Sequence, residues 1–359
     1  MTTNAVITGW GMYAPSRIMT NEELSTMVET SDEWIVSRTG IRERRIAADD
    51  ETTATLSVHA SRDALAVAGL DATDLDLIIL GTCTPDYYMP STAVLVGDQL
   101  GAKRAAGFDV MAACSGFIFS LATATAFVKS GMYRNVLVLG VELLSRFLDY
   151  TDRNTCVLFG DGAGAVIVSA SEQPGGLTGL DMYSDGSGAN GIIFPAGGSA
   201  RPTTLQTIAE GGHFVHMAGK EVYKYATRQL AESSQAALRN AGLTVADVDQ
   251  FLFHQANIRI IESVQNAVGI PADKTYLNIE RYGNTSAASV PMALVEAIAD
   301  DRIKPGDRLL MAAFGAGYTA GAAVVEWTAD PAQRSRAPGA QTRLGHRRAE
   351  PAAAEISGR

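Results

Sequence analysis

The chain has 359 residues, 47% of them hydrophobic and 19% charged, with a formal net charge of −10, which is the composition of a soluble globular protein large enough for one or two buried cores. The negative charge argues against a general nucleic-acid-binding protein. No apolar run is long enough to span a membrane, and the first residues lack the basic and apolar segments of a secretion signal, so we expect a cytoplasmic protein.

Short apolar runs alternate with longer alanine-rich stretches from the N-terminus to about residue 328. Runs rich in Val, Ile and Leu are typical of buried strands, and the stretches between them have the length and composition of helices, so the alternation predicts a layered α/β fold. The predicted strands include 5–8, 77–80, 136–139 and 165–168, and the predicted helices include 52–68, 115–129 and 223–240.

One pattern occurs twice. Gly69-Leu70 precedes an Asp-Leu-Asp triplet and an apolar run, and Gly242-Leu243 precedes an Asp-Val-Asp triplet and an apolar run. Short patterns of this kind also arise by chance, but polar motifs fall in matching segments of the two parts. We therefore expect two pseudo-symmetric halves, 1–170 and 171–328, with a site between them.

Cys114 is the first candidate for a chemical role. It lies between a strand-like run, 108–110, and a helical stretch, where unpaired backbone N–H groups and the helix dipole favour a thiolate. Its small neighbours leave room for an acyl group. The alternative is a buried structural cysteine, the usual fate of a free thiol. We favour that interpretation for Cys83 and for Cys156, which lies in a strand-like run.

Disulfides, metals and nucleotides are not expected. The three cysteines have neither the number nor the spacing of a disulfide framework or a zinc site. His213 and His216 would face opposite sides of a strand, and no third ligand is evident. The glycine-rich segment 160–164 resembles a phosphate loop but leads into a strand rather than a helix, so we reject a nucleotide site there.

Two further polar residues follow apolar runs in the second half. His254 comes directly after the run 251–253, at the edge where α/β folds place their sites. Asn284 lies in a glycine-containing loop before a helix of small residues. Taken alone, each is better explained as a structural histidine and as a helix-capping turn. A tight turn at 314–317 could present backbone N–H groups to an oxyanion.

Taken together, these motifs resemble those of the β-ketoacyl-acyl carrier protein synthase III family, the condensing enzymes that start type II fatty-acid synthesis. The resemblance covers about 1–328 and keeps the family's order of motifs. The tail, 329–359, is not part of it; that segment is rich in Ala, Arg, Pro and Gly, and we expect it to be disordered and solvated. The matching segments are 30–41, 112–117, 152–153, 159–165, 254–257, 283–291 and 313–317.

The resemblance implies a five-layered αβαβα thiolase fold, a homodimer, and a catalytic triad of Cys114, His254 and Asn284 with no cofactor or metal. Elongating synthases would have two histidines and thiolases a second cysteine, so Asn284 fits the initiating and chalcone synthase-like branch. An acyl-CoA primer would acylate Cys114, and malonyl-acyl carrier protein would then be decarboxylated and condensed with it. The backbone N–H groups of Cys114 and Ala316 would hold the oxyanion.

The resemblance also implies how coenzyme A binds. Trp34 and Arg38 would flank the adenine, with Arg153 on its other face, since aromatic and guanidinium groups stack on such rings. Asn257 would orient the pantetheine arm. The alternatives are a core position for Trp34 and surface ion pairs for the two arginines.

The remaining implied sites concern the acyl group and the carrier protein. Met89 and Phe314 would shape the acyl pocket, with Met89 reaching across the dimer into the partner's pocket. Lys224 and Arg259 would attract the acidic carrier protein. Asn266-Ala267 stands where family members have paired lysines, so this patch would be weaker or the carrier protein different.

Two alternatives stay open. A relative with the same triad could prime a polyketide or transfer an acyl group in a secondary pathway. A non-catalytic dimer subunit that only shapes a pocket would normally lack the nucleophile, whereas this chain has all three triad residues. The preferred acyl primer is not indicated by the sequence.

Overall fold

The computed structural model describes residues 3–330 and 332, and its framework consists of two mixed β-sheets. The first sheet has the strand order β1-β7-β6-β4-β5, and the second has the order β11-β12-β13-β8. Two short pairs, β2 with β3 and β9 with β10, lie outside them. The strands are β1 (Asn4–Tyr13), β2 (Arg17–Thr20), β3 (Glu43–Ile46), β4 (Leu77–Gly81), β5 (Ala106–Val110), β6 (Asn135–Glu142), β7 (Gly162–Ser171), β8 (Gly176–Tyr183), β9 (Ile192–Ile193), β10 (His216–Met217), β11 (Gln250–Phe253), β12 (Arg308–Gly315) and β13 (Thr319–Glu326).

Both sheets combine parallel and antiparallel pairs. In the first sheet, β4 is parallel to β5 and β6, whereas β7 is antiparallel to β1 and β6. In the second, β11 is parallel to β12, and β13 is antiparallel to β12 and β8. The predicted strands 77–80, 136–139 and 165–168 lie inside β4, β6 and β7. These three strands are buried along most of their length, as expected for a sheet covered on both faces.

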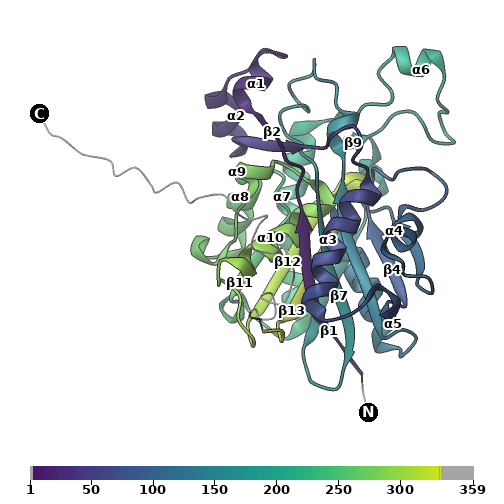
Figure 1. Ribbon diagram of the computed structural model, residues 1–359. Coiled ribbons are helices and arrows are strands. Elements are labelled where there is room, and N and C mark those ends of the chain that lie inside the picture. The colour runs from purple at the N-terminus through teal and green to yellow at the C-terminus, as the bar shows by residue number, and fades with distance from the viewer. Residues whose placement is uncertain (1–2, 331, 333–359) are drawn as a thin grey trace, which may run out of the picture.

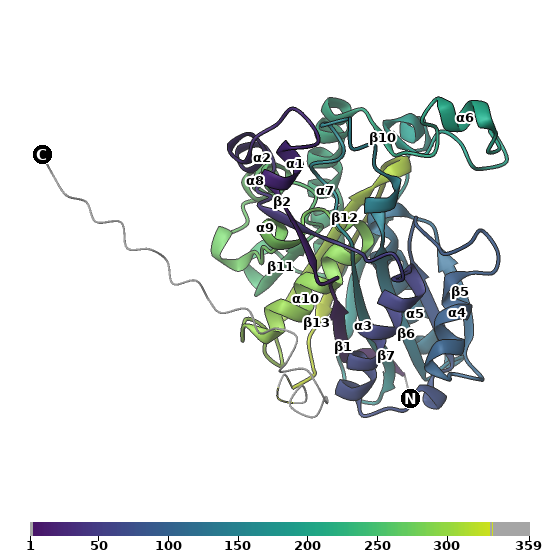
Figure 2. The same cartoon turned by 45° about the horizontal axis from the view of Figure 1, so that its top comes forward.

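Helices cover both faces of each sheet and produce five layers (Figures 1 and 2). α5 and α10 lie between the sheets and contact strands of both, α3 and α4 cover the outer face of the first sheet, and α7 and α8 cover that of the second. This αβαβα arrangement confirms the predicted fold class. The helices are α1 (Asn21–Ser25), α2 (Asp32–Thr39), α3 (Thr53–Ala68), α4 (Thr92–Leu100), α5 (Gly116–Lys129), α6 (Leu205–Ala209), α7 (Gly219–Ala241), α8 (Ile258–Val268), α9 (Ile279–Tyr282) and α10 (Ser289–Ala299).

Three apolar cores hold the layers together. One lies between the two sheets around α5 and α10 and includes the fully buried Phe117 and Leu294. The other two lie beneath the outer helices on either side. Trp10 in β1 and Trp327 after β13 meet in the central core, with ring centroids 5.2 Å apart. The first strand of one sheet and the last strand of the other therefore share one core.

Equivalent elements recur at a constant spacing along the chain. α3 and α7 both end at a glycine in the left-handed region, Gly69 with φ 67° and Gly242 with φ 70°. Glycine adopts this conformation without the strain that a Cβ atom would cause. Each helix is followed by a 3₁₀ turn, η1 (Ala72–Asp74) or η5 (Val245–Asp247), and then by β4 or β11. The glycine pattern in the sequence therefore marks the same helix end twice.

The central helices repeat in the same way. α5 is preceded by the 3₁₀ turn η2 (Ala113–Ser115), and α10 by η7 (Ser286–Ala288). The first residue of each turn has a positive φ, 46° at Ala113 and 48° at Ser286, and these residues are 173 positions apart, as are Gly69 and Gly242. The recurrence fits the predicted halves, 1–170 and 171–328, whose boundary remains a prediction.

Two sequence-based predictions concern segments outside the sheets. Cys156 was predicted to lie in a strand-like run, and this is wrong: it lies in consecutive turns, because Asp152 O accepts the N–H groups of Thr155 and Cys156. The predicted tail 329–359 lies outside the described residues except for 329, 330 and 332. Within 3–330 and 332, no helix has both the length and the apolar character needed to cross a bilayer.

Candidate active site

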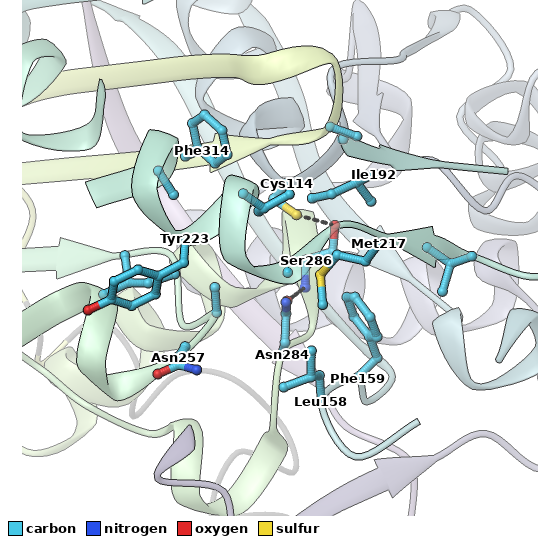
Figure 3. A pocket seen from close by; sticks show the side chains of 18 of the residues that line it. Cys114, Leu158, Phe159, Ile192, Met217, Tyr223, Asn257, Asn284, Ser286 and Phe314 are labelled. Carbon is cyan, nitrogen blue, oxygen red and sulfur yellow. Dashed lines mark hydrogen bonds between the residues drawn. The ribbon is translucent and has the colours of Figure 1, made fainter. Parts of the chain in front are cut away.

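α2 and β9 lie toward the same end of the two sheets (Figure 1). A cavity of about 930 Å³, seen from close by in Figure 3, is lined there by residues of α2, β9 and β10 among others. Its wall combines residues that follow strands of the first sheet, such as Cys83 and Met111, with Phe314 of the second sheet, the central 3₁₀ turns, α7 and α8. Ten of the twelve residues predicted for the site line it, and Met89 and Lys224 do not. The ten are Trp34, Arg38, Cys114, Arg153, His254, Asn257, Arg259, Asn284, Phe314 and Ala316.

Cys114 lies in the middle of η2, between the end of β5 and the start of α5. The turn is fixed from the second sheet: the Thr319 hydroxyl donates to Ala112 O at 3.0 Å, and the Ser115 hydroxyl donates to Thr319 O at 3.2 Å. Gly315 packs directly on this turn, and a Cβ atom there would lie 2.7 Å from Cys114 N. Glycine is therefore required at 315 to keep the Cys114 N–H group accessible.

The protonation of Cys114 differs from the sequence-based expectation. The start of a helix was predicted to favour the thiolate, but burial of the thiol dominates and raises the pKa of Cys114 to about 12. A hydrogen bond from the Ser286 hydroxyl, 3.2 Å from Sγ, acts in the opposite direction (Figure 3). The negative charge of the nearby Glu142 raises the pKa further. The resting site therefore holds a neutral thiol.

His254 follows β11, and its side chain is 4% exposed. Its N–H group donates to Ala312 O in β12 at 2.8 Å, which fixes the backbone beside the cavity. Nδ1 lies 2.6 Å from the hydroxyl oxygen of Ser289. Burial lowers the pKa of His254 to about 3, because a charged imidazole would lose its hydration. At neutral pH the ring is uncharged and can donate a hydrogen bond through only one of its nitrogens.

Asn284 joins the two halves of the site. Its backbone N–H donates to Leu158 O at 2.8 Å, and its carbonyl accepts from Gly160 N at 3.0 Å. The side-chain Oδ1 accepts the N–H of Ser286 at 2.8 Å. This bond fixes the orientation of the amide and leaves the Nδ2 group for the cavity that Asn284 lines. Asn284 thus has the turn-forming role considered from sequence and also presents a donor to the site.

Ala316 begins the 3₁₀ turn η8 (Ala316–Tyr318) at the end of β12. Its carbonyl oxygen lies 3.2 Å from the Thr319 hydroxyl oxygen, whose single proton it shares with Ala112 O, and Gly317 has φ 68°. The same Thr319 hydroxyl bonds to the turn that carries Cys114. The two turns that were predicted to supply oxyanion donors are therefore tied together by one side chain.

Two guanidinium groups lie against the ring of Trp34 at the mouth of the cavity. The Arg38 and Arg153 Cζ atoms are 4.7 Å and 5.4 Å from its centroid, and Arg153 also donates to Glu29 O at 3.1 Å. Trp34 is half-buried: it lines the cavity and also packs against a hydrophobic cluster. Among the described residues, neither arginine forms an ion pair. Asn257 caps α8 by accepting the N–H of Arg259 at 2.9 Å.

The residues predicted for the acyl group and the carrier protein are dispersed. Phe314, at the end of β12, lines the cavity and is 5% exposed. Met89 is 87% exposed on a loop away from the cavity of its own chain, so its proposed contact with a partner's pocket stays a prediction. Lys224 is exposed on α7 outside the cavity wall, and Arg259 is exposed at its rim.

Several residues of the site were missed from sequence. Ser286 lies one residue out of register with the nucleophile, since it corresponds to Ala113 rather than Cys114 in the recurring pattern. Glu142 ends β6 and has no accessible surface. Cys83, expected to be structural, lines the cavity and places Sγ 3.3 Å from both carboxylate oxygens of Glu142. The sequence signal that could have indicated these residues is a polar residue at the end of an apolar run. In the described part of the chain, no group of His, Cys, Asp and Glu is arranged to hold a metal ion.

Comparisons with known proteins give the same family along the chain. Residues 108–186 match the family model for 3-oxoacyl-[acyl-carrier-protein (ACP)] synthase III, and residues 238–327 match the model for its C-terminal part. The β-ketoacyl-[acyl-carrier-protein] synthase III of Roseiflexus castenholzii is 50% identical over 325 residues, which cover 90% of this chain and 98% of the relative.

Solved structures agree on the fold. The 3-oxoacyl-[acyl-carrier-protein] synthase III from Aquifex aeolicus is 44% identical, with a TM-score of 0.83 over 90% of this chain and 100% of that one. The priming β-ketosynthase from the R1128 polyketide biosynthetic pathway is 36% identical, with a TM-score of 0.86 over 92% and 98%. This chain has their thiolase fold, and it belongs to the β-ketoacyl-[acyl-carrier-protein] synthase III family of condensing acyltransferases.

Proposed function

We propose that this chain condenses an acyl-CoA primer with malonyl-acyl carrier protein, releasing CoA and CO₂ and giving a β-ketoacyl-acyl carrier protein, as the initiating step of type II fatty-acid synthesis. The observation that carries the proposal is that Cys114, His254 and Asn284 line one cavity in a chain 50% identical to a named β-ketoacyl-[acyl-carrier-protein] synthase III. The reaction is a thioester exchange followed by a carbon–carbon bond formation, and neither step requires a metal or a redox group.

In the first half-reaction, the Cys114 sulfur attacks the thioester carbonyl of the primer and CoA leaves. Negative charge develops on the carbonyl oxygen, and the N–H groups of Cys114 and Ala316 are the proposed donors to it. Gly315 supports this role, because its missing side chain leaves the Cys114 N–H group uncovered. The acyl chain would lie on the apolar wall beside Phe314.

In the second half-reaction, loss of CO₂ from the malonyl group leaves an enolate, which attacks the acyl-Cys114 thioester. The enolate oxygen needs donors that do not protonate its carbon. The amide Nδ2 of Asn284 meets this requirement at any pH. His254 meets it as a neutral imidazole, a state favoured by its lowered pKa. Together they stabilise the charge through fixed dipoles in a buried site.

The hydroxyl group of Ser289 is placed to set the tautomer of His254. Its hydroxyl has one proton and two acceptors within reach, His254 Nδ1 at 2.6 Å and Ser286 O at 2.9 Å. When the hydroxyl donates to Nδ1, the ring proton must be on Nε2, which is the donor that the enolate needs. Gln255 N also donates to this oxygen at 3.3 Å, which restricts where the hydroxyl proton can point. The proposed second half-reaction requires the orientation in which Ser289 donates to Nδ1 rather than to Ser286 O, with the ring proton on Nε2.

The substrates would enter past Trp34, Arg38 and Arg153. Their stacking at the mouth supports a role in holding the adenine and phosphates of CoA, since guanidinium groups bind both aromatic rings and phosphate. Asn257 would guide the pantetheine arm.

Positive charge at the rim is the proposed docking site for the acidic carrier protein. Arg259 is at the rim, Lys224 lies beyond it on α7, and Lys220, one turn before Lys224, lines the cavity. We include a homodimer in the proposal, with Met89 meeting the partner's pocket, and a cytoplasmic location.

A second function is favoured by one specific observation, the TM-score of 0.86 to a priming β-ketosynthase of a polyketide pathway. The same triad would then condense or transfer a different acyl group. The primer decides between the two functions, because the chemistry at Cys114 is shared.

Intact-mass analysis of the purified chain with acetyl-, isobutyryl-, isovaleryl- and octanoyl-CoA tests the proposal. We expect fast single acylation by a short straight or branched primer, absent in Cys114→Ala, and then condensation with malonyl-acyl carrier protein. Labelling restricted to long or unusual acyl groups would favour the specialised pathway. No labelling by any primer, or labelling without condensation, would contradict the proposed function.

A further inference from the structure

Glu142 is a fully buried carboxylate whose hydrogen-bond partners are all neutral. It ends β6 and has no accessible surface. The Thr84 hydroxyl donates to Oε2 at 2.7 Å, and Cys83 N donates to Oε1 at 3.1 Å. Among the described residues, no ion pair involves Glu142. A buried carboxylate without a cation is costly to fold, so its position beside the nucleophile needs an explanation.

Ser286 connects this carboxylate to the nucleophile. Its hydroxyl oxygen lies 3.2 Å from Cys114 Sγ and 3.2 Å from Glu142 Oε1, and Figure 3 shows the side chains of Ser286 and Cys114 facing each other. A hydroxyl has one proton, so it can donate to only one of them at a time. When it donates to Glu142, it accepts from the Cys114 thiol. The three groups then form a directed chain from sulfur to carboxylate.

The position of Ser286 is held by the fold. Its side chain is 1% exposed, its N–H group bonds to Asn284 Oδ1, and its backbone has φ 48°. A non-glycine residue in the left-handed region is strained, and such strain persists only where the surroundings fix it. The bridging geometry is therefore a constrained feature and not one rotamer among several on a mobile side chain.

The number of buried charged groups favours Glu142 over His254 as the acceptor of the thiol proton. Transfer from Cys114 to the neutral His254 would create a thiolate and an imidazolium in a site where burial disfavours both. Transfer to Glu142 moves one existing negative charge by two hydrogen bonds. The number of buried charges stays the same, so most of the desolvation cost has already been met in the folded state.

We propose that Glu142, acting through the hydroxyl group of Ser286, takes the proton of Cys114 when the thiol attacks and returns it when the product leaves. The S–H proton passes to Ser286 Oγ while the Ser286 hydroxyl proton passes to Glu142 Oε1, leaving a thiolate and a carboxylic acid. The thiolate forms the acyl-Cys114 thioester as CoA leaves as its thiolate. After condensation, Cys114 leaves as a thiolate and the same two protons move back. Glu142 and Ser286 are thus positioning residues for proton transfer, and the inference rests on the proposed function for the nucleophilic role of Cys114.

The groups that face Glu142 are compatible with this role. The ionisable ones are Cys83, after β4, and Cys114, in η2. Burial and the carboxylate raise the pKa of Cys83 well above its usual value, so Cys83 stays a neutral donor. Burial raises the pKa of Glu142 to about 7, while its donors act in the opposite direction. A carboxyl group in that range can both accept and release a proton at neutral pH.

Acylation of Cys114 by a truncated thioester, acetyl-N-acetylcysteamine, tests the relay without CoA recognition or carrier protein. Single-turnover rates are measured by mass spectrometry from pH 6 to pH 9 in wild type, Glu142→Gln, Ser286→Ala and His254→Ala. At pH 8 we expect both relay variants to acylate at least about 10-fold more slowly than wild type, below the usual contribution of a placed base, and also more slowly than His254→Ala. We also expect the wild-type rate to rise as Glu142 loses its proton and to show a solvent deuterium effect that is reduced in Ser286→Ala.

The opposite outcomes are distinct. If Glu142 only repelled the thiolate, removing its charge would lower the pKa of Cys114, and Glu142→Gln would acylate as fast as wild type or faster. That result overturns the proposal, as does a normal rate in Ser286→Ala or a loss in His254→Ala equal to that in Glu142→Gln. Ser286→Ala keeps the carboxylate, so it decides the matter if Glu142→Gln does not fold.

A matched control separates chemistry from destabilisation. Asp161 is another carboxylate without accessible surface, held by the N–H groups of Ser145 and Ala47 at 2.9 Å and 2.8 Å and outside the cavity wall. Asp161→Asn should acylate at the wild-type rate, and equal slowing in it and in Glu142→Gln would contradict the relay. Normal acylation without condensation with malonyl-acyl carrier protein would instead count against the proposed function alone.

Discussion

The pKa values of single residues at this site depend on burial more than on the position of the residue in a helix or strand. Cys114 and His254, both predicted from sequence, line the same cavity, but the sequence also predicted a thiolate from the helix start. The structure shows why that inference failed: the dipole effect is worth about 1 kcal/mol at an exposed position, whereas removal of a charge from water is a larger effect and raises the pKa of Cys114. Depth of burial depends on long-range packing, so no local motif reports it.

His254 should also determine how stability depends on pH. Its pKa falls from 6.5 in the unfolded chain to about 3 in the folded one, so below pH 6.5 the unfolded state binds a proton that the folded state does not. Stability is therefore lost as pH falls from 6.5 toward 3, at about 1.4 kcal/mol per pH unit.

Replacing His254 with glutamine removes this contribution. Between pH 7 and pH 5, the free energy of unfolding of His254→Gln should fall by about 2 kcal/mol less than that of wild type, since the chain spends about 1.5 units below the unfolded pKa. Urea unfolding at the two pH values measures the difference. Equal losses in the two proteins would show that His254 is hydrated in the folded state.

At the scale of elements, the sequence predicted which helices and strands exist better than it predicted where they end and which other elements they contact. The strands 77–80 and 136–139 and the helix 52–68 agree with β4, β6 and α3 to within a few residues, because apolar runs and caps are local signals. Cys156 was misplaced because a short run with apolar residues does not by itself distinguish a strand from consecutive turns. The bridge at Ser286 was missed because it links β6, η2 and η7, three elements distant in sequence.

The contact between the end of β12 and η2 leads to a prediction. A methyl group at residue 315 would lie 2.7 Å from Cys114 N and 3.1 Å from Ala113 Cβ. Gly315→Ala should therefore cover the N–H group proposed for the oxyanion and lower the acylation rate by about 10²- to 10³-fold, the usual effect of losing one such donor. Single-turnover acylation measures the change.

Gly321 on the neighbouring strand β13 provides the control. A Cβ atom there would meet the Ile118 side chain at 2.8 Å, and not the backbone of Cys114. Gly321→Ala should disturb packing while leaving acylation within a few-fold of wild type. If Gly315→Ala also acylates at the wild-type rate, Cys114 N–H is not an oxyanion donor.

For the whole molecule, the recurring spacing of 173 residues brings two similar units together around one cavity. The repeat was visible from sequence because helix-ending glycines and apolar runs mark each copy. The distance between the two copies could not be predicted from sequence, because it depends on glycines that pack against residues of the other copy. The central turns η2 and η7 meet between the sheets, and each carries part of the site. The contacts that pack the predicted halves together therefore also place the residues of the site.

Gly140 tests that relation. It lies in β6, and a Cβ atom there would be 2.1 Å from Ala287 O in η7, a backbone atom that cannot move without displacing the turn. Gly140→Ala should lower the free energy of unfolding by about 1–3 kcal/mol, as overpacking of a core does. It should also slow acylation, because Ser286 precedes Ala287 in the displaced turn.

Gly107 in β5 of the same sheet is the matched position, since its Cβ would meet Ala93 C at 3.1 Å within one half. Gly107→Ala should cost less stability and leave acylation near wild type. Unchanged unfolding midpoints in urea for Gly140→Ala would mean that the two copies tolerate separation, and that the cavity does not depend on this contact.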